Sequence, residues 1–218
     1  DGEGHNNSDG DDGVGGNGGS GGKRTVLEVA VKRKLDDILE RLSDRQTRPP
    51  VQSEVEEHSP YTYFFVQECE RMYWLVSEIR LSLQELDSAL KGDLSLSAVM
   101  ERLMHSLYQD TLPEAWAALS WPWVDSLGAW LADLVRREKQ LAEWTSTLTA
   151  PKVVWICGFF RPLAFLMAMQ QVLARRNGWR VEQLSLSVDV SKKTNPEDIE
   201  SASRDGAYVH GLFLEGAR

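Results

Sequence analysis

The chain has 218 residues, with 33 acidic and 24 basic side chains and a formal net charge of −9. Binding to nucleic-acid phosphates draws its affinity from clustered Lys and Arg, so this acidic balance argues against a nucleic-acid partner. No apolar run reaches the ~18 residues that a membrane span needs, which argues against a membrane partner.

Residues 1–24 are predicted to form a disordered tail. Glycine, aspartate and asparagine dominate residues 1–22, which bury too little apolar surface to offset the entropy of ordering them. This tail contains a G-x-G-x-x-G pattern at Gly13, Gly15 and Gly18. The pattern indicates a dinucleotide site only between a strand and a helix. Since no strand is predicted before it, we interpret the pattern as chance.

A helix is predicted over residues 25–43, followed by a polar linker over 44–60. Apolar residues recur at helical spacing on one face of this helix. They are Val31, Leu35, Ile38 and Leu42. Pro49 and Pro50 prevent the helix from continuing into the linker.

The helix predicted over residues 61–91 carries the clearest periodic pattern in the sequence. Its apolar residues alternate spacings of four and three, and they are Phe65, Cys69, Met72, Val76, Ile79, Leu83, Leu86 and Leu90. This period is typical of the seam of a helical bundle or a coiled coil. Because further helices follow at once, we interpret the seam as the buried face of a bundle helix. The alternative is a free-standing interaction module that uses the Phe65–Leu90 seam to recruit another coiled coil.

A third helix is predicted over residues 97–108. It places Met100, Leu103 and Leu107 on one face and His105 on its surface.

A capping box predicts the start of the next helix. Thr111 and Glu114 have the required spacing, with Trp116 and Leu119 then expected to point inward. A further helix is predicted to run to about residue 147. Its buried face is expected to consist of Leu127, Trp130, Leu134, Leu141 and Trp144.

The pattern changes after residue 150. A strand is predicted at 153–156, a helix at 162–176, a second strand at 184–190 and a last strand at 207–214, with a polar loop over 191–206. In the second strand, apolar residues alternate with polar ones: Leu184, Leu186, Val188 and Val190. The predicted fold class is α+β, mainly α, with a helical bundle followed by a short strand–helix–strand–strand segment.

The sequence predicts no catalytic, cofactor-binding or metal-binding residues. Two cysteines, Cys69 and Cys157, are too few for a disulfide framework or a Cys/His zinc site, and we interpret both as small buried hydrophobes in a reducing compartment. Cys157 with His210 downstream could act as nucleophile and base, but no positioned third group is visible, so a structural role is favoured. Gly22-Lys23 lacks the flanking residues of a P-loop.

Motifs in the second half of the sequence occur in a distinctive order. They are Leu112-Pro-Glu-Ala-Trp116; Leu127-Gly-Ala-Trp-Leu-Ala-Asp-Leu134 with Arg137, Leu141 and Trp144; Trp155-Ile-Cys-Gly-Phe-Phe160 with Pro162, Phe165-Leu166, Gln170 and Ala174-Arg175; and Asp205-Gly-Ala-Tyr-Val-His-Gly-Leu-Phe-Leu-Glu-Gly-Ala-Arg218. Together they resemble the C-terminal region of dynein heavy chains. The ending G-L-F-L-E-G-A-R is similar to axonemal heavy chains in particular.

The resemblance implies a domain organisation. Residues 61–218 would be the C-terminal domain of a dynein heavy chain, with a helical part at 61–149 and a partial α/β part at 150–218. Residues 25–60 resemble the end of the lid of the sixth AAA+ module. Family members continue after the Gly-Ala-Arg, so this sequence would be a truncated piece in which the β-rich half is incomplete.

The sequence departs from the family pattern at a few positions. Arg161 stands where a third Phe is usual, Leu163 where Gln is usual, and Ser203-Arg204 where Pro-Glu is usual. These departures leave the order of the motifs intact.

The resemblance also implies a function. The whole protein would be an ATP-driven, minus-end-directed microtubule motor of cilia or flagella, located in the cytoplasm, the cytoskeleton and the axoneme. This segment would pack on the AAA+ ring of the same heavy chain and modulate it. It would hold no nucleotide site and need no cofactor. Other dynein subunits and microtubules would be partners of the full protein.

Overall fold

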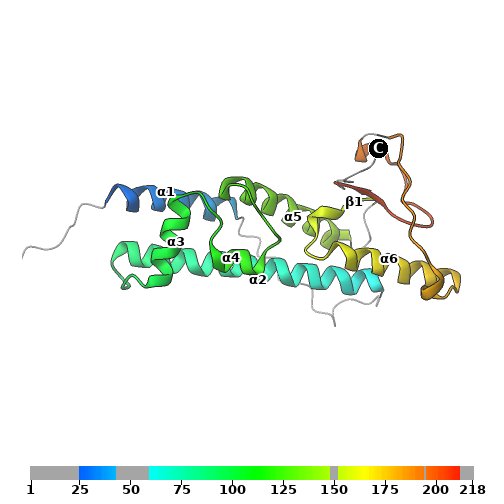
Figure 1. The fold of residues 1–218 in the computed structure, drawn as a ribbon, viewed down its shortest axis with the longest axis horizontal. Helices are drawn as coiled ribbons and strands as arrows, with labels where there is room; N and C mark the ends of the chain where they lie inside the picture. The colour runs from blue at the N-terminus through cyan, green and yellow to red at the C-terminus, as the bar shows by residue number, and fades with distance from the viewer. Residues whose placement is uncertain (1–24, 43–58, 148–151, 194, 212–218) are drawn as a thin grey trace, which may run out of the picture.

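A computed structural model describes residues 25–42, 59–147, 152–193 and 195–211, with the backbone alone for residues 145–147. It is α+β and mainly helical (Figure 1). The elements are α1 (Val26–Arg41), α2 (Pro60–Lys91), α3 (Ala98–Tyr108), α4 (Glu114–Leu119), α5 (Leu127–Thr147), β1 (Val153–Trp155), η2 (Ile156–Gly158), α6 (Pro162–Asn177), η3 (Val181–Gln183), η4 (Pro196–Asp198) and β2 (Tyr208–His210). The predicted tail and most of the predicted linker lie outside the described residues.

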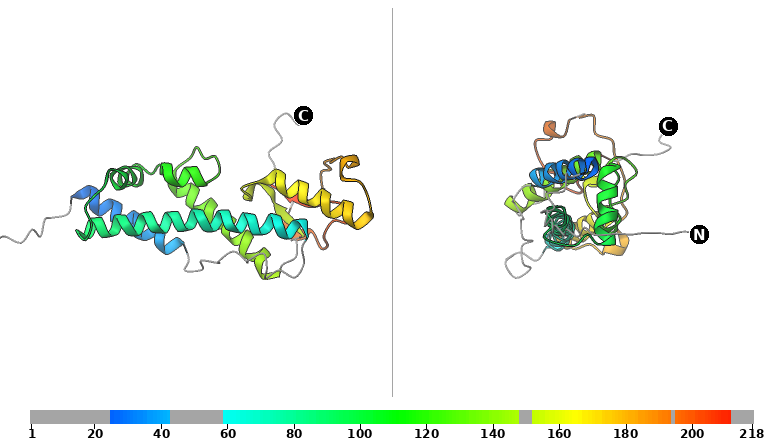
Figure 2. Two further views of the ribbon diagram at one scale, coloured as in Figure 1. Left: turned by 90° about the horizontal axis from the view of Figure 1, so that it is seen from below. Right: turned by 90° about the vertical axis from the view of Figure 1, so that its left-hand side faces the viewer.

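Helix α2 forms the long axis of the molecule (Figures 1 and 2). It begins with Ser59, whose hydroxyl accepts a hydrogen bond from the Thr62 N–H at 3.2 Å, and with Pro60 in the first turn. It ends at Gly92, whose φ of 88° only glycine adopts without strain. At 1.5 Å per residue, its 32 residues span about 48 Å.

The predicted seam of α2 is an internal one. Its residues from Phe65 to Leu86 are all buried, and Leu90 is partly buried. One hydrophobic core unites this seam with α1 and α3 at one end, and with α5 and α6 at the other. Because helices of the same molecule cover the seam, a second protein could reach it only if the bundle opened. The structure therefore favours the bundle helix over the coiled-coil module.

Replacing Ile79 with alanine is expected to lower the free energy of unfolding by about 2–5 kcal/mol. The Ile79 side chain is fully buried at the middle of the seam, so its removal leaves a cavity. Urea denaturation of both proteins measures the difference. Leu81→Ala on the exposed side of the same helix is the control, with an expected change of about 0.5 kcal/mol or less. A comparable loss in the two variants would contradict the assignment of the seam to the core.

The capping box predicted at Thr111 is wrong. Helix α3 ends in a Schellman motif: Asp110 has φ 55°, and the Thr111 N–H donates to the Ser106 carbonyl at 3.0 Å. The Thr111 hydroxyl also donates to Ser106. Thr111 therefore closes α3 and is not available to cap α4, which starts from Pro113 without a side-chain cap.

The inward orientation predicted for α4 is correct for one residue and wrong for the other. Trp116 is fully buried, whereas Leu119 is 42% exposed. Helix α4 has only six residues, and Leu119 is its last, so the backbone turns away before a second inward position is reached. The five residues predicted as the buried face of α5 are all buried.

The sheet contains two of the three predicted strands. β1 and β2 pair in parallel, with Val153 opposite Tyr208 and Trp155 opposite His210. The strand predicted at 184–190 is wrong: it is not assigned to any sheet, and Val188 and Val190 are 68% and 88% exposed. A segment with alternating apolar residues forms a strand only beside a neighbour that supplies the hydrogen bonds. None of the described residues pairs with this segment.

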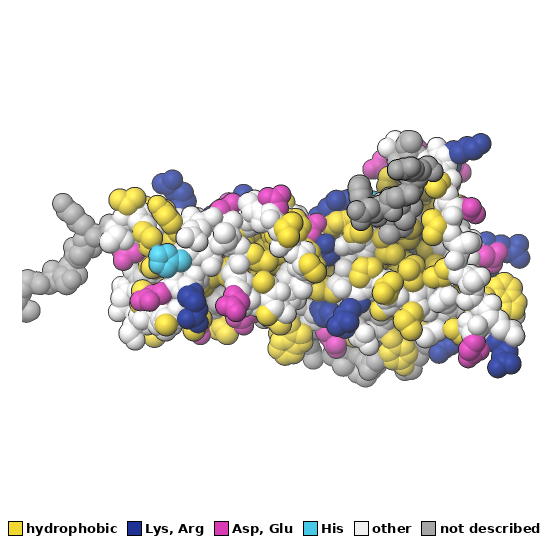
Figure 3. Space-filling model, in the orientation of Figure 1, with side chains coloured by type: hydrophobic (Ala, Val, Ile, Leu, Met, Phe, Trp, Pro, Cys, Tyr) yellow, Lys and Arg dark blue, Asp and Glu magenta, His cyan; other side chains and the backbone are white. Residues whose placement is uncertain are grey.

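Figure 3 shows hydrophobic side chains gathered over α6 and beneath the segment that leads back to β2. Within the described ranges, none of the helices is long and apolar enough to cross a bilayer.

Candidate functional site

The main chain of Trp155, at the end of β1, is held from two sides. On one side it lies in register with His210 of β2. In addition, the side-chain amide of Gln140 from α5 accepts a hydrogen bond from the Trp155 N–H at 2.9 Å and donates one to its carbonyl at 3.2 Å. Gln140 thus satisfies both polar groups of this residue, as a neighbouring strand would.

The indole of Trp155 lies against two glycines. A Cβ atom at Gly158 would lie 2.4 Å from Cε3 of the ring, and one at Gly211 would lie 2.5 Å from Cδ1. Gly211 also has φ 77°, a conformation that strains any residue with a side chain. The ring therefore occupies the space that side chains at positions 158 and 211 would fill. This contact joins the W-x-x-G motif to the H-G motif near the end of the sequence.

A column of stacked groups connects Trp155 to the helical bundle. The Arg137 guanidinium lies 5.2 Å from the ring centroid of Trp155 and 3.8 Å from that of Trp121. Trp121 stacks on Trp130 at 5.6 Å, and Trp130 stacks on Trp116 at 6.1 Å. Stacked aromatic pairs and cation–π contacts each add stability beyond the area that they bury. The column couples α4 and α5 to the sheet.

Arg137 is the charged centre of this column. Only 5% of its surface is exposed. Its Nε donates to Asp133 at 2.6 Å, and Nη1 donates to the Phe159 carbonyl at 3.3 Å. Burial lowers the pKa of the guanidinium, and the ion pair with Asp133 opposes that shift. A buried charge costs several kcal/mol unless it is paired, and both contacts compensate this one. We refer to the column and Trp155 with its two glycines as the tryptophan junction.

Glu68 of α2 binds the loop at residues 159–161, which Arg137 also contacts through the Phe159 carbonyl. Its carboxylate is fully buried and accepts hydrogen bonds from the main-chain N–H groups of Phe160 at 2.6 Å and Arg161 at 3.2 Å. Arg71 lies 3.4 Å from it. These two N–H groups immediately precede α6, so the negative charge also suits the N-terminus of that helix. Burial raises the pKa of Glu68, although the main-chain hydrogen bonds oppose this.

Sequence reasoning missed Glu68. The signal that could have revealed it was its position: it lies four residues after Phe64 and four before Met72, both buried, on the inner side of α2. A carboxylate at such a position requires donors from another element. Which element supplies them could not be read from α2 alone.

The residues considered for nucleophilic chemistry lie at the edge of the junction. The interpretation of Cys157 as a buried side chain is wrong, because it is exposed; its thiol contacts the Gly211 carbonyl. Cys69 is buried, as predicted. Burial, reinforced by Arg136, lowers the pKa of His210. Among the described residues, no group of His, Cys, Asp and Glu side chains has a geometry that could hold a metal ion.

Comparison with known proteins agrees with the motifs that meet at this junction. The family model for the C-terminal domain of dynein heavy chains matches residues 7–218. The protein belongs to this dynein family.

Relatives of this dynein domain include axonemal heavy chains. It is 46% identical over 191 residues to the ciliary dynein beta chain of Heliocidaris crassispina, and 46% identical over 190 residues to human dynein axonemal heavy chain 9. It is 42% identical over 194 residues to the dynein beta chain of the flagellar outer arm of Chlamydomonas reinhardtii. These matches cover 87–88% of the present sequence and 4% of each relative. The sequence thus spans a small part of the length of the relatives that it matches.

The departures from the dynein pattern leave the junction untouched. The side chains of Arg161 and Leu163 are exposed. It is the main-chain N–H of Arg161 that donates to Glu68, so the identity of the side chain does not affect this bond. Arg204 is exposed as well, and its carbonyl accepts a hydrogen bond from Arg176 at 3.1 Å. The final motif residues, 212–218, lie outside the described residues.

Replacing Gly158 of this dynein domain with alanine is expected to destabilise it by about 1–3 kcal/mol, because the new methyl group must displace the Trp155 ring. Thermal unfolding measures the loss. Gly128→Ala in α5 is the matched control, because nothing lies within 4 Å of a Cβ there and the helix should gain about 0.5–1 kcal/mol. Equal effects at the two glycines would contradict the packing of Trp155.

Proposed function

We propose that this protein is the C-terminal segment of an axonemal dynein heavy chain, and that it packs on the AAA+ ring of the same heavy chain and modulates its motion. The whole protein would be an ATP-driven, minus-end-directed microtubule motor located in the axoneme of cilia or flagella. Other dynein subunits and microtubules would be its partners through the full protein. This segment itself would neither bind nor hydrolyse nucleotide.

The observation that carries the proposal is the family match over residues 7–218 together with the axonemal identity of the relatives. The architecture is compatible with such a role. A single core runs from α1 to α6 along the 32-residue helix α2, and the tryptophan junction ties the sheet to the bundle. An element that transmits motion must resist bending, and a close-packed interior of this kind does.

The apolar surface also supports docking rather than a free existence. Two large side chains of α6, Leu163 and Met167, are exposed outside the core. Single exposed apolar residues are ordinary, but contiguous ones mark contact surfaces. Leu163 and Met167 are four residues apart and therefore share one side of α6.

The test uses an axonemal heavy-chain motor that contains the ring, the stalk and this domain. We compare the intact motor with one that lacks residues 61–218, measuring microtubule-stimulated ATPase activity and microtubule gliding velocity. Loss of a modulating element should change velocity while leaving nucleotide binding to the ring intact. Titration calorimetry of the isolated 218-residue protein with ATP should give no heat of binding.

Two results would contradict the proposal. One is unchanged ATPase activity and velocity after the deletion, with no association of the separate domain with the ring. The other is binding of ATP by the isolated protein at micromolar concentration. Leu163→Ser with Met167→Ser in the intact motor tests the apolar side of α6, and Val124→Ser, at a fully exposed loop position, is its control.

A further inference from the structure

The side of α2 opposite its buried seam carries a second pattern. Tyr63, Glu70, Trp74, Glu78, Leu81 and Glu85 recur there at helical spacing, and we call them the outer stripe. Glutamates alternate with large apolar side chains along it. The outer stripe is thus distinct from the seam that forms the core.

The apolar members of the outer stripe are exposed. Trp74 is 64% exposed, Leu81 55% and Tyr63 39%. By contrast, the tryptophans of the junction, Trp116, Trp121 and Trp130, are all buried. Tryptophan is enriched among the residues that dominate the energy of protein contacts. A tryptophan in the middle of a long helix, exposed and one turn from two glutamates, suits a contact surface.

The charge of the outer stripe has one sign. Glu70, Glu78 and Glu85 lie on it, and no Lys or Arg does. The nearest basic residues of α2 point to other partners: Arg71 contacts the buried Glu68, and Arg80 donates to the Leu42 carbonyl. On the neighbouring helices, Arg102 of α3 faces this region together with Glu114 of α4, so the local balance stays acidic.

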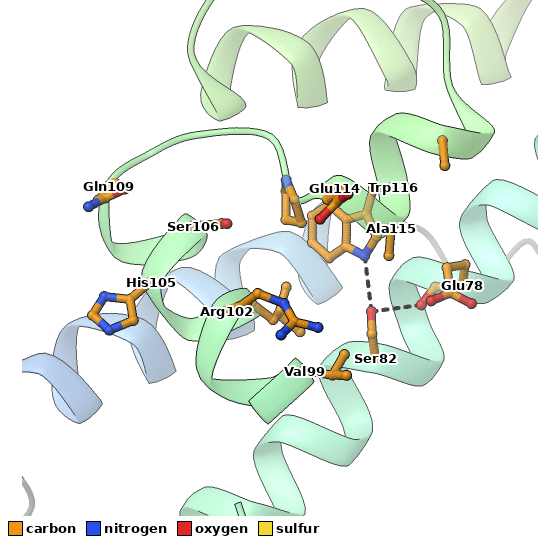
Figure 4. A pocket seen from close by; sticks show the side chains of 13 residues that line it. Glu78, Ser82, Val99, Arg102, His105, Ser106, Gln109, Glu114, Ala115 and Trp116 are labelled. Atoms are coloured by element: carbon orange, nitrogen blue, oxygen red, sulfur yellow. Dashed lines mark hydrogen bonds between the residues drawn. The ribbon is translucent and has the colours of Figure 1, made fainter. Parts of the chain in front are cut away.

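A hollow of about 520 Å³ adjoins the outer stripe (Figure 4). Glu78 belongs to both, and α3 and α4 supply most of the remaining wall, including Val99 and Ala118. The indole of Trp116 lines the hollow, and its N–H donates to the Ser82 hydroxyl at 3.0 Å, so this polar group is already satisfied. The hollow can therefore accept an apolar side chain without leaving that donor unpaired.

We propose that the outer stripe of α2 and the adjoining hollow form a docking surface for a basic amphipathic helix of a partner protein. Apolar side chains of that helix would pack on Trp74 and Leu81, and one would enter the hollow. Lys or Arg side chains flanking its apolar face would pair with Glu70 and Glu85. Charge complementarity selects this partner, because an acidic helix would be repelled. The inference goes beyond the packing of the domain on the ring and does not depend on it.

The test selects helices from a displayed library on the intact 218-residue protein. Each library member is a helix of about 18 residues with a fixed leucine face. The positions that flank this face vary among Lys, Glu, Gln and Ala. Lys-flanked members should be enriched, and one of them then serves as a synthetic fluorescent probe. Its affinity should fall steeply as salt is added.

Variants of the protein locate the binding site of that probe. Trp74→Ala should weaken binding by about tenfold or more, as for a residue at the centre of an interface. The double variant Glu70→Lys, Glu85→Lys should reverse the selection, so that Glu-flanked helices are enriched. Trp179→Ala is the matched control, because Trp179 is also exposed but lies beyond the end of α6. It should leave the affinity for the probe unchanged.

Several outcomes would overturn the proposal. Enrichment of neutral or Glu-flanked helices on the unmodified protein would refute the charge argument. Equal loss of binding in Trp74→Ala and Trp179→Ala would show nonspecific adsorption. A dimer that Trp74→Ala converts to a monomer would show that a second copy occupies the stripe. None of these results bears on the ring-deletion test, so failure of the two ideas can be told apart.

Discussion

Replacing Trp130 with alanine is expected to lower the free energy of unfolding by about 3–5 kcal/mol, the range for removing a buried aromatic side chain. Trp130 is fully buried between Trp116 and Trp121 and belongs to both stacked pairs. Its N–H donates to the Ser120 hydroxyl at 3.0 Å, so the change also removes a hydrogen bond. Chemical denaturation followed by far-UV circular dichroism measures the loss.

Two further variants test how much of this loss comes from the buried aromatic ring. Trp130→Phe keeps an aromatic ring but loses the N–H and part of the side-chain volume. Its free energy of unfolding should therefore lie between those of the original protein and of Trp130→Ala. Trp74→Ala removes the same atoms from an exposed position and should cost about 0.5 kcal/mol or less. If Trp130→Ala were no more harmful than Trp74→Ala, the stacked column would not contribute to stability.

Replacing Glu68 with alanine is expected to destabilise the fold by about 2–6 kcal/mol, because two partly buried N–H groups each lose a charged acceptor, at about 1–3 kcal/mol each. These are the N–H groups of Phe160 and Arg161 at the start of α6. Glu68→Gln should cost less, since its amide oxygen can still accept one of the two bonds. Hydrogen exchange should show faster exchange at residues 160 and 161 in both variants.

The control for Glu68 is Glu70→Ala, two positions along the same helix on the exposed side, which should leave the melting temperature unchanged.

The pH dependence of the stability gives a second criterion for Glu68. Because burial raises the pKa of Glu68, the folded state binds this proton more tightly than the unfolded state does. Its contribution to stability is largest below the ordinary pKa and falls as the pH rises through the folded-state pKa. The destabilisation by Glu68→Ala should therefore become smaller as the pH rises over that range. A destabilisation that grows with pH would contradict the raised pKa of Glu68.

Local patterns account for the elements that were predicted correctly. The alternation of four and three that ends at Leu90 predicts α2 and its buried face, because a helix brings such residues to one side whatever covers them. The family motifs likewise predict membership in the dynein heavy chain family, which the match over residues 7–218 confirms. The meeting of those motifs at Trp155 was not predicted, since residues 155 and 211 are distant in the sequence.

Three of the wrong predictions concern residues whose surroundings the local pattern did not determine. Thr111 has the spacing to cap α4, but its N–H and hydroxyl donate hydrogen bonds to the Ser106 carbonyl at the end of α3. Residues 184–190 alternate as a strand does, but no described residue pairs with them. Cys157 follows a buried strand, but the 3-10 turn η2 directs it outward. In each case the local pattern was present, but the adjoining backbone, or the lack of a pairing strand among the described residues, decided the outcome.

Spacing along one polypeptide was enough to predict which stretches are helical, which of their faces are apolar and which family the protein belongs to. The partners of the polar and aromatic groups depend instead on how the helices pack in the folded molecule. Glu68 meets the start of α6, Arg137 lies between Trp121 and Trp155, and Gln140 completes the edge of β1. Hydrogen bonds and ring contacts act over a few ångströms and depend on direction, so residues far apart in the sequence form them only once the apolar core has brought their helices together.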